Sequence, residues 1–304
     1  MAPIDDSEKE QTEVIDSPIV VQLKKLDDDY LELHRAYEKE EQELRRQFSN
    51  RQKPLLEQRT KDLLVSEGSE DPATGTPALK GFWLKALSNH PQFDGEIEEW
   101  DEPVLEYLRD IMTVDLDPND STKGYRLKFL FAENPYFTNA ILSKEYHSAE
   151  SSPYTGEVNV SEINGCTINW KDGKDVTTAL VKKQKETKKG KNNKSVKQES
   201  KEEQEPRTSF LRSFFRSLKE GSGLPESIHQ DELERIQGEA EEGMDEEEMV
   251  EAIMSNDYDM GCAIRFNIIP FAVRWYTGEA SPEGDEDDEE EEEEEEEEDD
   301  MDEE

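Results

Sequence analysis

Residues 18–48 of the chain read PIVVQLKKLDDDYLELHRAYEKEEQELRRQF. Apolar and aromatic side chains recur here in steps of three, four and seven residues, and mainly Asp, Glu, Lys, Arg and Gln lie between them. This heptad spacing predicts a long amphipathic helix, whose apolar stripe is too narrow for a globular core and therefore faces a second helix. The stripe comprises Ile19, Leu23, Leu26, Tyr30, Leu33, Tyr37, Leu44 and Phe48.

The helix is expected to span residues 18–65, with a capping side chain and an early proline at its start. Leucines resume in helical spacing after Pro54, so this proline is expected to kink the helix and not to end it. The helix would be ~70 Å long at 1.5 Å per residue, far longer than an ordinary globular helix. Homodimerisation explains the stripe better than the alternative, in which the helix packs along its own domain.

An α+β domain is expected over residues 81–280, after a linker over residues 66–80 that is rich in Gly, Pro, Ser and Thr. A short helix beginning at Phe82 should end at Asn89-His90-Pro91. Asp101 is expected to cap a second helix, whose inner face would consist of Val104, Leu105, Leu108, Ile111 and Met112.

From Tyr125 the apolar spacing changes to two, which predicts a half-buried strand with Tyr125, Leu127, Phe129 and Phe131 on one face. The remaining expected elements are strands near residues 140–147, 165–170 and 176–185, a tight turn at Asp172-Gly173, a short aromatic helix at 209–215 and an apolar helix at 264–276. Connections this short predict an antiparallel β-meander with helices packed on one face.

The chain is strongly acidic, with a formal net charge of −42 over 304 residues. Residues 283–304 contain twenty acidic side chains and no basic one, so residues 281–304 are expected to form a disordered acidic tail, and residues 1–17 a disordered N-terminal segment. A second acidic segment spans residues 225–260, with fourteen acids and the single base Arg235. This charge predicts a strongly basic partner, although a tail alone could serve solubility only.

Residues 171–201 form a basic island, with eleven lysines against four acids. Its lysine-rich hairpin is expected at residues 182–201, and three interpretations remain open: a nuclear-import patch, a solvated hairpin tip and a nucleic-acid patch. Nucleic-acid binding is the weakest of the three, because a net charge of seven stands beside a much larger acidic excess. The proposed import patch consists of Lys182, Lys183, Lys185, Lys188 and Lys189.

Several classes of protein are disfavoured. The acidic N-terminus does not resemble a signal peptide, and no apolar run reaches the 18–20 residues that a membrane span needs. Cys166 and Cys262 lie far apart without metal-ligand spacing, which indicates reduced thiols and no metal site. None of the common nucleotide-binding or hydrolase motifs is present, so the sequence favours a binding protein without a cofactor over an enzyme.

Four blocks resemble the nucleosome assembly protein family. They are FWLKALSNHP at 82–91, GYRLKFLFAENPYFTN at 124–139, GCTINWKDGKDVT at 165–177 and IIPFAVRWYTGEA at 268–280. The order of long helix, α+β domain, lysine-rich hairpin and acidic tail also matches this family. The short linker and Asn89-His90-Pro91-Gln92 look like the branch of the SET oncoprotein, whereas the last block favours the nucleosome assembly proteins proper.

This resemblance implies a histone chaperone without ATP, in which two subunits pair through antiparallel long helices and form a dome with an acidic concave underside. The implied partners are histone H2A–H2B and also H3–H4. The nuclear-import interpretation of the lysine patch adds importins, and shuttling between cytoplasm and nucleus, to these expectations. A SET-like regulatory protein, such as a phosphatase inhibitor or a shuttling adaptor for basic cargo, is the alternative. The candidate histone contacts are Glu133, Asp245, Glu246, Glu247, Glu248, Asp257 and Asp259.

Overall fold

The computed structural model describes residues 17–65, 74–150, 158–183, 201–225, 228–229, 232–233 and 244–281. The chain divides into two compact units, one that ends at Arg51 and one that begins at Gln52. Among the described residues, no helix is both long enough and apolar enough to cross a membrane. The N-terminal segment, the acidic tail and most of the lysine-rich hairpin lie outside the described residues.

Helix α1, Pro18–Leu63, confirms the predicted long helix, and it continues through Pro54. All eight residues of the predicted apolar stripe are exposed, with fractions between 47% for Phe48 and 72% for Leu33. The last turns of α1 belong to the second unit, where Thr60 donates a hydrogen bond to Asp110 and Leu63 is buried. No described residue of the first unit therefore buries the apolar stripe.

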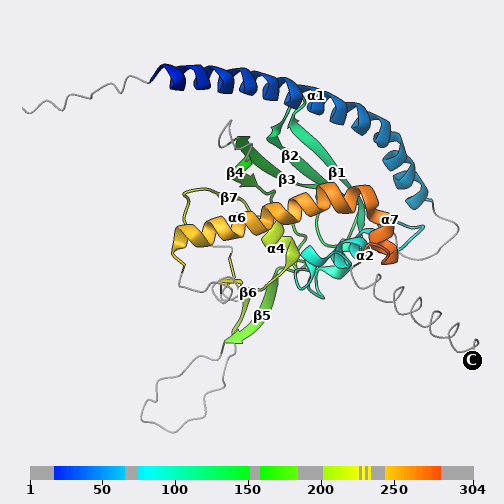
Figure 1. Ribbon diagram of the computed structural model, residues 1–304. Coiled ribbons are helices and arrows are strands. Elements are labelled where there is room, and N and C mark those ends of the chain that lie inside the picture. The colour runs from blue at the N-terminus through cyan, green and yellow to red at the C-terminus, as the bar shows by residue number, and fades with distance from the viewer. Residues whose placement is uncertain are drawn as a thin grey trace, which may run out of the picture. The chain divides into compact units, whose positions relative to one another are not determined.

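The second unit contains a five-stranded antiparallel sheet in the order β1-β2-β3-β4-β7, whose first four strands are drawn in green in Figure 1. The first four strands form an antiparallel meander of the kind that the sequence predicts, but only β2 and β3 were predicted as members of it. The strand predicted at residues 176–185 belongs instead to a separate two-stranded sheet, so its place in the meander is wrong. In β2 the side chains of Tyr125, Leu127, Phe129 and Phe131 are buried, which confirms the predicted alternation. The strand bounds are β1 Leu108–Asp117, β2 Asp120–Phe131, β3 Ile141–Glu150, β4 Val158–Asn164 and β7 Leu218–Lys219.

A separate two-stranded sheet pairs β5, Thr178–Lys183, with β6, Lys201–Pro206. It extends away from the five-stranded sheet (Figure 1). Lys182 and Lys183 lie at the end of β5, whereas Lys185, Lys188 and Lys189 lie outside the described residues.

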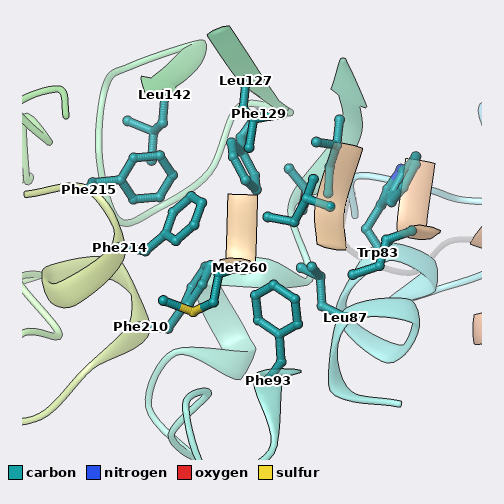
Figure 2. Close-up of a cluster of buried hydrophobic side chains, with 14 of the residues drawn as sticks. Trp83, Leu87, Phe93, Leu127, Phe129, Leu142, Phe210, Phe214, Phe215 and Met260 are labelled. Carbon is teal, nitrogen blue, oxygen red and sulfur yellow. The ribbon is translucent and has the colours of Figure 1, made fainter. Parts of the chain in front are cut away.

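Helices pack on one face of the large sheet, and aromatic side chains fill the space between the two layers. Figure 2 shows Phe129 and Leu127 of β2 above Phe214, Phe210 and Met260. The ring centroids of Phe129 and Phe214 are 5.5 Å apart in an edge-to-face arrangement, which suits aromatic pairs. The helices are α2 Phe82–Ser88, η1 Pro91–Phe93, α3 Glu102–Leu105, α4 Phe210–Phe214, α6 Glu246–Cys262, the π-helix η2 Ala263–Ile268 and α7 Ile269–Thr277.

The helix predicted from Asp101 to Met112 is wrong, because it ends at Leu105 and strand β1 begins at Leu108. A register shift between Leu108 and Asp110 is a β-bulge, so Leu108 pairs with Phe131 while Ile111 pairs with Phe129. Leu108 and Ile111 are therefore both buried, although they are three residues apart. The extra residue of the bulge gives two buried residues of one strand the three-residue spacing that is typical of a helix.

The carboxylate of Asp101 does not cap α3. It accepts hydrogen bonds from the Ser209 hydroxyl at 2.5 Å and from the Phe210 amide at 2.7 Å, at the start of α4. Asp101 therefore ties the α3 region to a helix more than a hundred residues later in the chain.

The strand predicted over residues 165–170 is also wrong, because the fourth strand of the meander ends at Asn164. The segment after it is held mainly by side chains. The Asn139 side chain accepts through Oδ1 from the Asn169 backbone amide at 2.7 Å and donates through Nδ2 to the Thr167 carbonyl at 3.1 Å. Trp170 makes an isolated β-bridge with Phe137.

The described end of the predicted linker packs on the second unit. Thr76 is buried, the Gly75 amide donates to the Glu106 carbonyl at 2.9 Å, and the Ala78 amide donates to the Leu63 carbonyl at 3.1 Å. A Cβ atom at Gly75 would lie 2.1 Å from the Leu108 oxygen, so this close approach requires glycine. Residues 66–73 lie outside the described residues.

Candidate functional site

Helix α6 presents one apolar face to the sheet and one acidic face to solvent. Met249, Val250, Ile253 and Met254 are buried in the core. Glu247, Glu248, Glu251 and Asp259 are exposed, and we call these four side chains the α6 acidic face. The helix contains no Lys, Arg or His, so nothing within it neutralises these charges.

The first turn of α6 is held by its own acids. The Asp245 carboxylate accepts from the amides of Glu247 and Glu248 at 3.0 Å, and the Glu248 carboxylate accepts from the Asp245 amide at 2.9 Å. This capping box satisfies free amides at the positive end of the helix dipole. Glu246 accepts from the Leu224 amide at 2.9 Å, so Asp245, Glu246 and Glu248 shape the backbone as well as carry charge.

The α6 acidic face includes one residue that the sequence analysis missed. Glu251 lies one helical turn after Glu247 and Glu248, and it is exposed. The sequence contains a signal for Glu251, because in a helix it lies on the same surface as Glu247 and Glu248. It was missed because residues 225–260 were taken as one acidic segment without assigned helical positions.

The loop that follows η1 also carries exposed acids. The side-chain Nε2 of Gln92 in η1 donates to the Asn256 side-chain oxygen of α6 at 3.0 Å, so the loop that follows η1 begins beside this helix. That loop carries exposed Asp94 and Glu99, and no base occurs between Pro91 and Trp100. The sequence analysis did not select these acids.

Asp257 was predicted to contact histone, and this prediction is wrong because its side chain is only 1% exposed. Its carboxylate lies 2.5 Å from the Lys144 ammonium of β3, which is completely buried. The Tyr146 hydroxyl donates to the same carboxylate at 3.0 Å, and Lys144 also donates to the Phe214 carbonyl. Asp257 thus fastens α6 to the sheet.

Burial dominates the electrostatics of this pair. It lowers the pKa of Lys144 to about 8, against the attraction of Asp257 and the hydrogen bond between them. It also raises the pKa of Asp257 above its ordinary value, which the Lys144 charge opposes. A charge buried this deeply is tolerated only while its partner is present.

The helix approaches the sheet closely at Gly261. A Cβ atom there would lie 2.4 Å from the Tyr146 ring and 2.6 Å from the Tyr125 hydroxyl. Glycine at this position therefore lets α6 contact the two tyrosines of β2 and β3, two residues after the exposed Asp259.

The other predicted residues lie on different elements. Glu133 is exposed in the turn after β2, on a different element from α6. The eight stripe residues are exposed on α1, as an unpartnered apolar helix face would be. Within the described part of the chain, no three His, Cys, Asp or Glu side chains converge on a possible metal site.

Residues 19–279 match the family model described as nucleosome assembly protein (NAP). The chain is 34% identical to nucleosome assembly protein 1;1 of Oryza sativa subsp. japonica over 218 residues, which are 71% of this chain and 49% of that protein. It is 35% identical to nucleosome assembly protein 1;3 of Arabidopsis thaliana over 229 residues, which are 74% of this chain and 52% of that protein. The chain thus spans about half the length of the curated relatives it matches.

Solved structures show the same fold. Nucleosome assembly protein 1 from Plasmodium knowlesi superposes with a TM-score of 0.60 at 27% identity, over 86% of this chain and 95% of that one. The nucleosome assembly protein from Plasmodium falciparum gives a TM-score of 0.55 at 26% identity, over 86% of this chain and 96% of that one.

Proposed function

The chain belongs to the nucleosome assembly protein family, and on this premise we propose that it is a histone chaperone. It binds H2A–H2B, and also H3–H4, through acidic surfaces of the second unit. Binding requires no catalysis, cofactor or ATP. The protein promotes both assembly and disassembly of nucleosomes.

The observation that carries this proposal is the α6 acidic face. Its four carboxylates lie on a helix that a capping box and a buried ion pair hold in place, and the helix has no base of its own. Ordered charges of one sign create a stronger local potential than the same charges spread along a mobile chain. Such a surface suits the dense positive charge of a histone.

The mechanism follows from competition between polyanions. Carboxylates that cover histone lysines and arginines prevent unspecific aggregation of histones with DNA. DNA presents a higher linear charge density together with the specific contacts of the nucleosome, so the correct complex still forms. Deposition is then an exchange of partners that needs no chemical step.

The chaperone is a homodimer in this proposal. The exposed stripe of α1 would be covered by the same stripe of a second copy, in an antiparallel coiled coil. An antiparallel arrangement keeps the two acidic second units at opposite ends, whereas a parallel one would bring like charges together.

The lysine-rich hairpin is proposed to bind importins, which would let the protein shuttle between cytoplasm and nucleus. Lys182 and Lys183 support this role by their place at the end of β5, in a two-stranded sheet that extends away from the main sheet (Figure 1). Lys185, Lys188 and Lys189 continue the basic sequence.

A titration tests the function directly. Purified H2A–H2B and H3–H4 are titrated separately with the protein at several salt concentrations. We expect saturable binding whose affinity falls steeply as salt rises, because charge contacts are screened over about 8 Å at physiological ionic strength. Binding of neither histone pair at low salt would contradict the proposal.

A further inference from the structure

Arg216 and Glu232 form a further ion pair in the interior of the second unit. Arg216 lies in the turn between α4 and β7 and binds Glu232 through both terminal nitrogens, with Nη1–Oε2 at 2.9 Å and Nη2–Oε1 at 2.6 Å. The two side chains are 7% and 16% exposed, respectively. A two-bonded pair of this kind is the strong form of an arginine–carboxylate contact, and water has little access to it here.

This pair acts on the buried pair that attaches α6. The pKa values of Lys144 and Asp257 are shifted mainly by burial, and the Arg216 guanidinium lowers both of them in addition. Lys144 also donates to the carbonyl of Phe214, two residues before Arg216. Two cations and two carboxylates therefore lie within reach of one another, and their formal charges cancel. We call Lys144, Asp257, Arg216 and Glu232 the charge quartet.

The quartet connects α6 to the segment that precedes it. Asp257 belongs to α6, whereas Glu232 belongs to the connection between β7 and α6. The described parts of this connection are also held elsewhere, because the Leu224 amide donates to Glu246 at 2.9 Å and Ile228 packs against the hydrophobic core. Glu232 is therefore an internal contact of an acidic segment whose other acids include the exposed ones of α6.

Removal of the Glu232 carboxylate would leave one uncompensated positive charge in the quartet. Arg216 would lose the carboxylate that both of its terminal nitrogens bind, and its buried Nε already has no partner among the described residues. A buried cation without a counter-charge is costly, and in a poorly solvated interior its charge acts strongly on its neighbours. Those neighbours are Lys144 and Asp257, so the disturbance reaches α6.

We propose that Glu232 is a positioning residue for histone binding, which acts through Arg216 and the rest of the charge quartet and does not touch histone. The inference rests on the proposed function, in which α6 carries the histone-binding face. It gives one acid of the segment at residues 225–260 an internal role, and it makes the attachment of α6 depend on both ion pairs together.

Unfolding in denaturant tests whether the quartet is one unit. Glu232→Gln and Lys144→Met are compared with the parent, singly and together. If the two ion pairs were independent, their effects on the unfolding equilibrium constant would multiply, since each substitution breaks a different pair. We expect the double variant to be less destabilised than that product by about threefold or more, because Asp257 and Arg216 remain as a neutral pair. A double variant that reaches the full product, or that does not fold, overturns the proposal.

Titration of H2A–H2B tests the positioning role. We expect Glu232→Gln to bind about threefold more weakly or worse, although Glu232 makes no histone contact in this proposal. The double variant Arg216→Met with Glu232→Gln should bind close to the parent, because it leaves neither charge unpaired. The control Glu220→Gln removes an exposed acid next to β7 and should also bind close to the parent.

The double variant separates positioning from direct contact. If it binds as weakly as Glu232→Gln, Glu232 itself touches histone and the inference is wrong. The inference is also wrong if Glu232→Gln binds like the parent. If the parent does not bind histone, the proposed function fails, whereas the unfolding comparison still decides whether the quartet is one unit.

Discussion

Helices α1 and α6 follow the same period but place opposite chemistry on the surface. On α1 the apolar stripe is exposed and charged residues fill the remaining positions. On α6 the apolar side is buried in the core and the exposed side carries acids. An exposed apolar stripe can be buried against a second amphipathic helix, whereas an exposed acidic face attracts a basic molecule.

The comparison separates assembly from binding. In our account α1 determines how two copies join, and α6 determines what the joined protein binds. The two helices also differ in how they are held, since α6 depends on a buried ion pair and α1 on a partner chain. Each helix can therefore be altered without the other, and the predictions below use this independence.

The largest expected effect is on α1. Replacing Leu26, Leu33 and Leu44 with Lys removes three apolar anchors, each worth roughly 1.5–3 kcal/mol when buried. We expect light scattering to report a monomer or an unfolded chain. The matched control Asp28→Lys with Glu32→Lys lies on the side of α1 away from the stripe and should stay dimeric. A stable dimer of the triple variant would refute the assignment of the stripe.

The next effect is on the attachment of α6. Asp257→Ala leaves the Lys144 ammonium buried without its partner, which should lower the free energy of unfolding by about 3–5 kcal/mol. Denaturant titration measures it. The double variant Lys144→Met with Asp257→Leu should recover much of the loss, because no charge is then buried. An Asp257→Ala variant as stable as the parent would show that the pair does not hold α6.

A smaller effect concerns the loop beside α6. His90 accepts from the Gln92 amide at 3.1 Å, and burial lowers its pKa below the ordinary 6.5. The neutral ring is therefore favoured by folding, and this stabilisation is present above pH 6.5 and lost as pH falls through the lowered pKa.

The measurement is the unfolding free energy of the parent and of His90→Gln between pH 5 and pH 7. The difference between them should shrink as pH falls. If the difference in unfolding free energy between the parent and His90→Gln does not change with pH, protonation of His90 does not destabilise the loop.

The sequence was informative where one local pattern corresponded to one local structure. The stripe of α1 and the alternation from Tyr125 to Phe131 are both set by a regular period, and both were predicted correctly. The bulge at the start of β1 broke that correspondence, since Leu108 and Ile111 adopt helical spacing within a strand. This segment forms a strand because it pairs with β2, and its own sequence pattern does not indicate this pairing.

The acidic site was harder to predict because acids are abundant in this chain. Asp257 and Asp259 are two residues apart, yet one is buried against Lys144 and the other is exposed. Helical positions separate them once α6 is known to begin at Glu246, because Ile253, Asp257 and Met260 then share the inner face. The buried lysine that neutralises Asp257 lies more than a hundred residues away and leaves no local signal.

Titration of H2A–H2B with three variants, at two salt concentrations, tests the central claim that the ordered face of α6 binds histone. The first variant changes Glu247→Gln, Glu251→Gln and Asp259→Asn, and leaves Glu248 in its capping box. The second removes the same number of charges from α1 through Asp28→Asn, Glu32→Gln and Glu57→Gln. The third deletes residues 283–304.

We expect the α6 variant to bind about tenfold more weakly, mainly through faster dissociation. The α1 variant should bind like the parent. Deletion of the tail should weaken binding only modestly and slow association, because exposed tail charges are screened over about 8 Å. If deletion of the tail abolishes binding while the α6 variant behaves like the parent, the histone site is the tail and the account is wrong.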